Sequence, residues 1–228
     1  MSLAEQLRET PTDVASIIDH TNVDPAATED EIRTLCAEVR EYGFCSAVVV
    51  PYHAPLAAEL LSGEANVVPV IGFPYGIQNA AAKREEVREL REHVDEIDMV
   101  MNRTAFANGN DELVVSDIEA VVEAAGDIPV KCIIESPLLS REEITRAATL
   151  VEEGGAAFVK TAVGYDGPTD PDEVVAIREG VSNEMQVKAS GGIGSFEEVL
   201  TMVEAGANRI GASAGVEICE SVRSDSSS

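Results

Sequence analysis

The chain has 228 residues, 45% of them apolar, and its 42 acidic and 16 basic residues give a formal net charge of −26. This length allows a substantial core, and a single α/β barrel fits it as well as two small domains do. So acidic a surface repels phosphate backbones, which excludes nucleic acid as an expected partner.

No membrane or secretory segment is expected. No stretch approaches the run of about 18 apolar residues that a membrane span needs, and the start "MSLAEQLRETPTD" lacks the basic and apolar parts of a signal peptide. We therefore predict a cytoplasmic protein that does not bind membranes. The acids are spread through "TEDEI", "KREEVRELREHVDEID" and "SREEIT", as on solvated helix faces. With so few lysines, this composition resembles the proteins of halophiles that accumulate salt.

Short apolar or β-branched runs alternate with amphipathic stretches along the chain. The eight expected strands are 16–19, 46–50, 67–71, 97–101, 130–134, 158–160, 186–188 and 209–211. Helices are expected near 29–42, 54–62, 78–93, 112–125, 141–153, 171–180, 196–205 and 213–222. Thr28 before "EDEI" and Ser140 before "REEI" are typical helix starts, and the glycines of "EEGG" and "EAG" are typical helix ends.

Eight alternations of strand and helix predict parallel pairing, and the closed form of that arrangement is a single (β/α)8 TIM barrel. A doubly wound open sheet is the alternative, because periodicity does not show closure. No linker or change of composition divides the chain. We therefore expect one domain over residues 1–223, followed by a disordered tail, "SDSSS", at 224–228.

The four cysteines give no sign of a metal or redox site. Cys36, Cys45, Cys132 and Cys219 form no CxxC pair and have no histidine nearby at ligand spacing. Buried, inert thiols are the expected result. We predict no metal and no nucleotide cofactor.

The lysines carry more information. Only four occur, and Lys83, in the charged "AAAKREEVREL", is expected on a helix surface. Lys131, Lys160 and Lys188 lie in "PVKCII", "FVKTA" and "QVKAS", each in or beside a β-prone run. Because this composition discourages exposed lysine, we predict that the three lysines at expected strands do more than carry surface charge.

A barrel would gather several polar residues on its active face, which the carboxyl ends of the strands form. Asp19 and His20 end the first expected strand, Asp98 lies in the fourth, and Lys160 and Lys188 end the sixth and seventh. A lysine that is buried beside another cation has its pKa lowered to about 7–8 and becomes a nucleophile for a carbonyl. With a carboxylate to move protons through water, this set predicts a metal-free aldolase that acts through a Schiff base.

Small residues follow the last two expected strands, in "SGGIG" and "GASAG". They let backbone N–H groups approach an anion, and loops at these places are a frequent phosphate site in such barrels. A phosphorylated small substrate is therefore expected. The residues that we assign to substrate or phosphate binding are Gly164, Gly191, Gly192, Gly211, Ser213 and Asp19.

Seven segments in order, "IDHTNVDPAATEDEI", "VIGFPYG", "EIDMVMN", "KCIIE", "FVKTAVGY", "VKASGGI" and "RIGASAG", resemble the deoxyribose-phosphate aldolase family over nearly the whole chain. The resemblance implies that Lys160 forms the Schiff base, that Lys188 lowers its pKa and that Asp98 relays protons. It also implies cleavage of 2-deoxy-D-ribose 5-phosphate to D-glyceraldehyde 3-phosphate and acetaldehyde, in deoxynucleoside catabolism. We further expect a homo-oligomer, either a dimer or a tetramer.

The chain departs from the family at four positions. Ala162 and Val163 replace two hydroxyl residues of the common "KTSTG", Gly194 stands where many members have arginine, and Val48 stands where a cysteine is frequent. The three catalytic residues remain, so these changes bear on substrate preference.

Structural alternatives accompany these roles. Asp98 is also a candidate for a simple salt bridge, and Lys188 for a phosphate or carbonyl contact. Asp19 would bind substrate or a lysine, His20 fits a structural role, and Lys131 and Glu135 fit a buried ion pair or polar layer better than catalysis. Two other functions stay open, a Schiff-base aldolase for another aldehyde, phosphorylated or not, and a non-catalytic phosphosugar-binding barrel.

Overall fold

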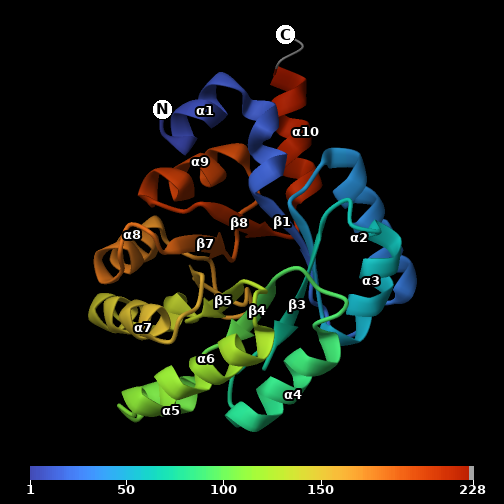
Figure 1. The fold of residues 1–228 in the computed structure, drawn as a ribbon. Coiled ribbons are helices and arrows are strands. Elements are labelled where there is room, and N and C mark those ends of the chain that lie inside the picture. The colour runs from blue at the N-terminus through green and yellow to red at the C-terminus, as the bar shows by residue number, and fades with distance from the viewer. Residues whose placement is uncertain (226–228) are drawn as a thin grey trace.

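The computed structural model of the protein describes residues 1–225, with side chains through Arg223. Eight parallel strands pair in chain order, and β8 pairs with β1 to close a barrel (Figure 1). This closure confirms the predicted TIM barrel and excludes the open sheet. The strands are β1 (Ile18–Asn22), β2 (Ser46–Val49), β3 (Asn66–Ile71), β4 (Ile97–Val100), β5 (Val130–Ile133), β6 (Phe158–Lys160), β7 (Gln186–Ser190) and β8 (Arg209–Ala212).

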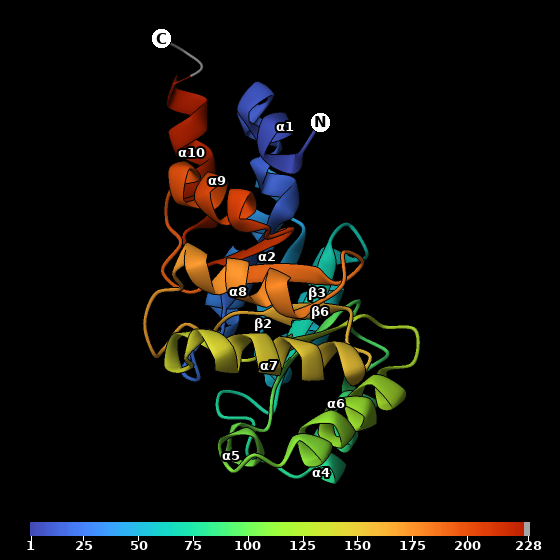
Figure 2. The same ribbon diagram turned by 90° about the vertical axis from the view of Figure 1, so that its left-hand side faces the viewer.

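Helices surround the barrel, and the first and last helices lie at the same end of the molecule (Figures 1 and 2). The α-helices are α1 (Leu3–Glu9), α2 (Glu29–Tyr42), α3 (Ala54–Leu61), α4 (Ala80–Leu90), α5 (Arg103–Ala107), α6 (Asp111–Ala125), α7 (Arg141–Glu153), α8 (Pro171–Gly180), α9 (Phe196–Ala205) and α10 (Gly215–Asp225). The 3-10 turns are η1 (Pro11–Ile17), η2 (Pro51–His53) and η3 (Ser136–Leu138). The sequence patterns did not indicate α1, η1 or α5, which are short.

The helix ends that the sequence predicted well are fixed by contacts between residues close together in the chain. Thr28 and Ser140 each form a capping box, in which the hydroxyl accepts a backbone N–H and a glutamate three residues later binds back. Gly206 ends α9 with φ 117°, a conformation that L side chains rarely adopt. These contacts lie within a few residues of each other, so the sequence alone reveals them.

Strand ends were predicted less well. We expected β1 at 16–19, but it runs from Ile18 to Asn22 because its far end pairs with β2, where Asn22 lies opposite Val49. Strand β7 extends to Ser190 because that residue pairs with Gly211 of β8. Of the predicted disordered tail, residues 226–228 lie outside the described residues, so the tail and the domain bounds stay predictions.

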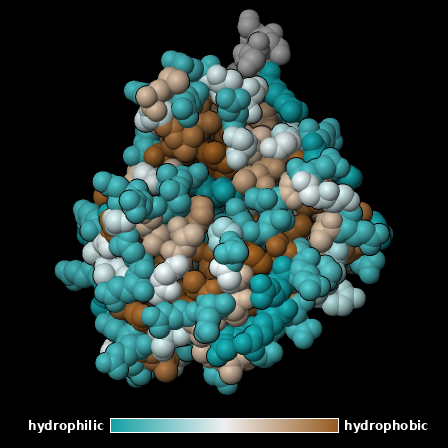
Figure 3. Space-filling view, viewed as in Figure 1, coloured by the Kyte–Doolittle hydropathy of each residue, from teal (hydrophilic) through white to brown (hydrophobic). Residues whose placement is uncertain are grey.

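The outer face of the barrel and the inner faces of the helices form one large apolar core. Cys36, Cys132 and Cys219 are buried as expected, whereas Cys45 is partly exposed. Burial raises the pKa of the Cys36 and Cys45 thiols to about 11 and that of Cys132 to about 12, which favours the less reactive thiol over the thiolate. Hydrophilic residues cover most of the face seen in Figure 3, with smaller apolar patches between them. No helix among the described residues is long and apolar enough to cross a membrane.

The prediction that Lys83 lies on a helix surface is wrong. Its side chain is fully buried between α4 and α6, where Nζ donates to Asp117 Oδ2 at 2.6 Å and to the Val100 carbonyl at 2.9 Å. Lys83 shares the inward face of α4 with Val87, one turn along. The charged neighbours in the sequence hid this face, and only the position of Asp117, 34 residues away, makes burial of the ammonium tolerable.

This pair gives a first prediction, on stability. Replacing Lys83 with Met should lower the free energy of unfolding by about 3–5 kcal/mol, because it leaves the Asp117 carboxylate buried without its partner. The double variant Lys83→Met/Asp117→Leu should recover most of that loss. Chemical denaturation of the four proteins of this cycle measures the effect, and an equal loss in single and double variants would contradict it.

Candidate active site

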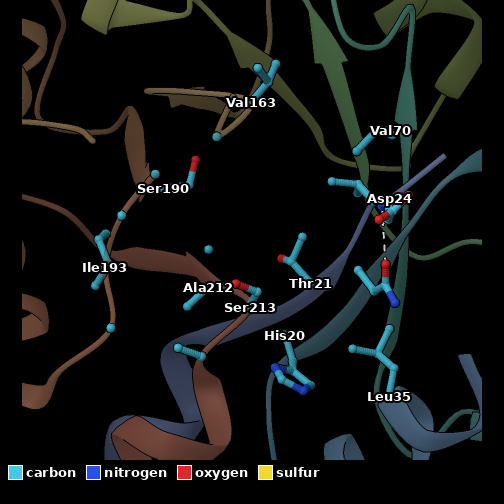
Figure 4. A pocket seen from close by; sticks show the side chains of 18 of the residues that line it. His20, Thr21, Asp24, Leu35, Val70, Val163, Ser190, Ile193, Ala212 and Ser213 are labelled. Carbon is cyan, nitrogen blue, oxygen red and sulfur yellow. Dashed lines mark hydrogen bonds between the residues drawn. The ribbon is translucent and has the colours of Figure 1, made fainter. Parts of the chain in front are cut away.

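A cavity of 980 Å³ opens at the carboxyl ends of the strands. Its wall includes parts of β1, β6, β7 and β8 and the loops that follow them (Figure 4). Five of the six residues that we assigned to substrate or phosphate binding line this cavity, namely Gly164, Gly191, Gly192, Gly211 and Ser213. The sixth, Asp19, is fully buried and does not line it.

Lys160 is the only lysine among the residues that line the cavity. Lys160 is the last residue of β6 and is 4% exposed. Its Nζ lies 2.7 Å from Asp98 Oδ2. The lysine therefore has an open side toward the cavity and a carboxylate behind it. This is the placement that attack on a bound carbonyl requires.

Lys188 and Asp98 lie behind Lys160, and both are fully buried. Lys188 Nζ is 2.8 Å from Asp98 Oδ2 and 2.6 Å from Asp19 Oδ2. The structure thus brings the three predicted catalytic residues together, with Asp98 Oδ2 shared by two ammonium groups. It also shows Asp19 bound to a lysine, which was the second of its two predicted partners.

Lys131 belongs to a polar layer deeper in the barrel, as expected. Its Nζ lies 3.0 Å from Asp98 Oδ1 and 2.5 Å from Glu96 Oε2. Arg209 closes this layer, at 2.8 Å from Asp19 and 3.3 Å from Glu96. Sequence reasoning missed Glu96, which immediately precedes β4, and Arg209, which begins β8, although an alternating pattern would have pointed each inward.

The charges of this network shape the pKa values in it. The pKa of Lys160 is lowered to about 8, chiefly by burial and also by the positive charge of Lys188, and these effects outweigh the opposing pull of Asp98. Burial opposes ionisation of Asp98, but Lys131, Lys160 and Lys188 outweigh it and hold the pKa of that carboxyl well below its usual range.

The balance of charges in the buried network also favours a neutral Lys160. The buried network holds four basic groups, Lys131, Lys160, Lys188 and Arg209, against three acidic ones, Asp19, Glu96 and Asp98. Loss of one proton balances it. Lys160, the group nearest the cavity, is the one whose pKa is lowered.

Glu135 does not pair with Lys131. It follows β5 in a left-handed conformation, with φ 51°, and its buried Oε2 accepts the Val163 N–H at 3.3 Å. The same oxygen lies 4.0 Å from Arg103 Nη1. Glu135 therefore supports the loop after β6, which carries part of the cavity wall, and the polar layer is built without it.

His20 has the structural surroundings that we expected, at the edge of the cavity. Its Nε2 lies 2.8 Å from Glu38 Oε2, and its ring centroid is 4.7 Å from that of Phe44. A Cβ on Gly215, at the start of α10, would lie 2.8 Å from His20 Nδ1. Glycine at this position lets the helix start pack against the histidine.

The glycines of the loop after β7 have conformational and packing reasons to be glycine. Gly191 has φ 105° and Gly192 has φ 73°, and a Cβ on Gly192 would lie 2.7 Å from Pro168. A Cβ on Gly211 would lie 3.0 Å from Lys188 Cε, so this glycine also makes room for the buried lysine. Ser213 lies two residues before α10, whose amino end favours an anion.

Two of the positions that depart from the family lie in apolar packing, and a third has its backbone N–H in a hydrogen bond. Val163 packs with Val100, Ile133 and Phe73, and Val48 packs with two other valines. The Gly194 N–H donates to Glu198 Oε2 at 2.9 Å, so that donor is already in use. The structure describes no cluster of three or more His, Cys, Asp or Glu side chains that could hold a metal ion.

Comparison with known proteins agrees with this geometry. A model of the DeoC/LacD family of aldolases matches residues 14–221, most of the chain. The chain belongs to the DeoC/LacD aldolase family. In this family it is 48% identical to the deoxyribose-phosphate aldolase of Methanothermobacter thermautotrophicus over 219 residues, which are 94% of this chain and 97% of the relative. It is 45% identical to the deoxyribose-phosphate aldolase of Thermococcus gammatolerans, over 92% of this chain and 97% of that protein.

A solved structure of a deoxyribose phosphate aldolase has the same fold. The tetrameric deoxyribose phosphate aldolase of Aeropyrum pernix superposes with a TM-score of 0.89 at 33% identity, over 97% of both chains. The family resemblance inferred from the seven segments is therefore confirmed, and the protein is an aldolase, a carbon–carbon lyase.

The lowered pKa of Lys160 gives a second prediction. Covalent trapping of Lys160 by acetaldehyde and borohydride should fall roughly tenfold per pH unit below pH 8 and level off above it, because only the neutral amine attacks. In Lys188→Met the midpoint should move to higher pH, since a positive charge beside Lys160 is lost. Trapping rates between pH 5 and 10 test this, and a wild-type midpoint near the ordinary lysine value would contradict it.

Proposed function

We propose that this protein is a class I aldolase that reversibly cleaves 2-deoxy-D-ribose 5-phosphate to D-glyceraldehyde 3-phosphate and acetaldehyde, in deoxynucleoside catabolism. The observation that carries the proposal is Lys160, a buried lysine that faces the cavity with its pKa lowered to about 8. Membership of the family and relatives named deoxyribose-phosphate aldolase support it.

The reaction begins when the neutral Lys160 amine attacks C1 of the open-chain sugar. Loss of water gives an iminium, which withdraws electrons from the bond between C2 and C3. Removal of the C3 hydroxyl proton breaks that bond and releases D-glyceraldehyde 3-phosphate, leaving an enamine on Lys160. Protonation at C2 and hydrolysis by water then release acetaldehyde and restore the amine. No cofactor enters any of these steps.

Lys188 and Asp98 act from behind Lys160. Lys188, whose Nζ shares Asp98 Oδ2 with Lys160, keeps the amine of Lys160 partly neutral through its positive charge. When Lys160 is neutral or bound to substrate, its ion pair with Asp98 weakens. Asp98 is then able to bind a water molecule that accepts the proton of the C3 hydroxyl. Asp98 would therefore relay protons through water, without touching the sugar.

The phosphate group is expected on the side of the cavity formed by the loops after β7 and β8. Gly191, Gly192 and Gly211 add no side chains to this side, and Ser213 lies beside the amino end of α10. Gly164 lines the cavity on the β6 side. The binding there relies on backbone N–H groups and a hydroxyl.

We infer a cytoplasmic protein that works on small-molecule phosphosugar and aldehyde substrates without nucleic acid or membrane partners. The Aeropyrum pernix relative is a tetramer, which supports a homo-oligomer, either a dimer or a tetramer. The net charge of −26 supports a protein adapted to concentrated salt.

A third prediction tests the Schiff base. With 2-deoxyribose 5-phosphate and borohydride, intact mass and peptide mapping should show one reduced adduct on Lys160. Lys160→Leu should give no adduct and lose at least about three orders of magnitude in kcat, because the covalent route is gone. Lys83→Arg, which keeps a charge outside the cavity, serves as a control lysine variant and should still be trapped. A folded wild-type protein without an adduct would contradict the proposal and favour a non-catalytic phosphosugar-binding barrel.

A fourth prediction concerns salt. Because ion screening shortens to about 3 Å at 1 M salt, the mutual repulsion of the acidic surface should fade in concentrated KCl. The melting temperature should then rise by about 10 °C or more between 0.1 M and 2 M KCl. Sucrose at the same osmolality is the control, because it is also excluded from protein surfaces but screens no charge. An equal rise in sucrose would remove the electrostatic explanation.

A further inference from the structure

The amino end of the barrel interior holds a cation that the reaction steps above do not use. Arg209 begins β8, and its side chain is 16% exposed. Its Nη1 lies 2.8 Å from Asp19 Oδ1 and 3.3 Å from Glu96 Oε2. Because a guanidinium does not lose its proton in proteins, Arg209 brings a permanent positive charge to the buried network.

An aromatic ring lies below Lys160 at this end of the barrel. Phe158 begins β6, is 9% exposed, and lies on the same face of the strand as Lys160, two residues further on. Arg209 Cζ lies 5.6 Å from the centroid of the Phe158 ring, and Lys131 Nζ lies 5.7 Å from it. These buried groups have little contact with water, so the charges among them are weakly screened.

A chain of alternating charges connects Arg209 to Lys160. Arg209 binds one oxygen of Asp19, and the other oxygen, Oδ2, lies 2.6 Å from Lys188 Nζ. Lys188 in turn shares Asp98 Oδ2 with Lys160, at 2.8 and 2.7 Å. The strand register gives the same order, because Arg209 pairs with Lys188 and Lys188 pairs with Lys160. Two strand spacings of about 4.8 Å separate the Cα atoms of Arg209 and Lys160 by about 10 Å.

Four other groups of the network are held in their charged forms. Burial opposes the charges of Arg209 and Lys131, but neighbouring carboxylates raise the pKa of both groups above their usual values. Burial also opposes ionisation of Asp19 and Asp98, but neighbouring cations hold the pKa of both carboxyls below the usual range. With Arg209, the network has four basic groups against three acidic ones. Without Arg209 the two numbers would be equal, and Lys160 would keep its proton.

We propose that Arg209 is a positioning residue for the aldolase reaction, which makes Lys160 the group that gives up its proton. The fixed charge of Arg209 partly neutralises Asp19 and Glu96, so these carboxylates do not balance the lysines in full. Lys188 alone does not have this effect, because its charge is matched by Asp19. This inference rests on the proposed Schiff-base chemistry of Lys160. It gives a part in forming the nucleophile to a residue that does not line the active-site cavity.

Other titratable groups surround the network. Strands β2 and β3 contain no charged residue, so the charged groups that face Lys160 or Arg209 within the barrel are Asp19, Glu96, Asp98, Lys131 and Lys188. Cys45, before β2, is a thiol with its pKa raised to about 11 by burial, and burial also raises the pKa of Glu135, after β5. The titratable residues elsewhere on the cavity wall are His20, Asp24, Glu31, Glu38, Tyr165 and Glu217. None of these outer groups changes in the variants below, so a difference between variants reports the charge of the network.

The fifth prediction is a shift of the pH profile in Arg209→Met. The profile is that of covalent trapping by acetaldehyde and borohydride, measured in 2 M KCl, where surface charges are screened far more than buried ones. At an effective dielectric constant of about 20, loss of a positive charge about 10 Å away should raise the midpoint for Lys160 by about one unit. Trapping at pH 7 should then be roughly tenfold slower, while the plateau at high pH should stay within about twofold of wild type.

Two variants test whether the charge itself is responsible. Arg209→Lys keeps the positive charge and should leave the midpoint within about 0.3 unit of wild type. Arg146→Met is the matched control, because it also removes a cation over a phenylalanine ring, 4.1 Å from the centroid of Phe106, and an ion pair, with Asp111 at 3.0 Å. Arg146 lies on α7, outside the barrel interior, so its loss should not move the midpoint.

Removal of an acidic group should have the opposite effect. Glu96→Gln leaves four basic groups against two acidic ones, so the midpoint should fall by about one unit. The double variant Arg209→Met/Glu96→Gln restores an excess of one basic group, and its midpoint should return to within about 0.3 unit of wild type. A purely structural role of Arg209 would lower the plateau or the melting temperature without moving the midpoints in opposite directions.

The outcomes separate this inference from the proposed function. If wild-type enzyme is trapped at Lys160 but neither Arg209→Met nor Glu96→Gln moves the midpoint, the role of Arg209 is refuted while the aldolase stands. If acetaldehyde leaves no adduct on Lys160 in folded wild-type protein, the proposed function itself fails, and this inference fails with it. If Arg209→Met does not fold, Glu96→Gln decides the point alone, because an unchanged midpoint in that variant overturns the charge balance on which the role of Arg209 rests.

Discussion

The contact on which the site depends is the sharing of Asp98 by three lysines inside the barrel. Lys160 and Lys188 bind one carboxylate oxygen at 2.7 and 2.8 Å, and Lys131 binds the other at 3.0 Å. One carboxylate does not neutralise three ammonium groups, so the network needs Asp19 and Glu96 as well. Even with these, a basic group is left in excess, and Lys160, the lysine that faces the cavity, is the one with a lowered pKa. The lowered pKa of Lys160 and the charge balance of the buried network are therefore linked.

This arrangement has a stability cost that the rest of the fold offsets. Buried ion pairs rarely stabilise a protein more than apolar side chains of the same volume would. The barrel nevertheless tolerates a charged interior because its outer face packs against the helices in one continuous apolar core. The Lys83 and Asp117 pair adds a second buried charge between α4 and α6, outside the reaction. Stability comes from the helix layer, which leaves the interior free for chemistry.

The cavity above Lys160 has two chemical characters. Toward β7 and β8, glycines and a serine leave backbone N–H groups and the start of α10 near the space where a phosphate is expected. Toward β2 and β3, valines, prolines and aromatic rings surround a smaller second cavity without a basic group. Lys160 lines the cavity between these two sides.

The sequence by itself predicted the fold class and most helix bounds, and it singled out Asp98, Lys160 and Lys188, whose side chains the structure brings together. Alternating periodicity and helix caps depend on neighbours a few residues away, and the rare lysines stood out at expected strands. The tertiary structure alone decided the contacts of Lys83, Asp19, Glu96 and Arg209, because their charged partners lie 34 to 190 residues away in the chain. It also decided strand ends such as Asn22, which depend on the adjacent strand, and the smaller cavity, which exists only where loops from distant strands meet. Burial and charge pairing are properties of the folded chain, so no local pattern contains them.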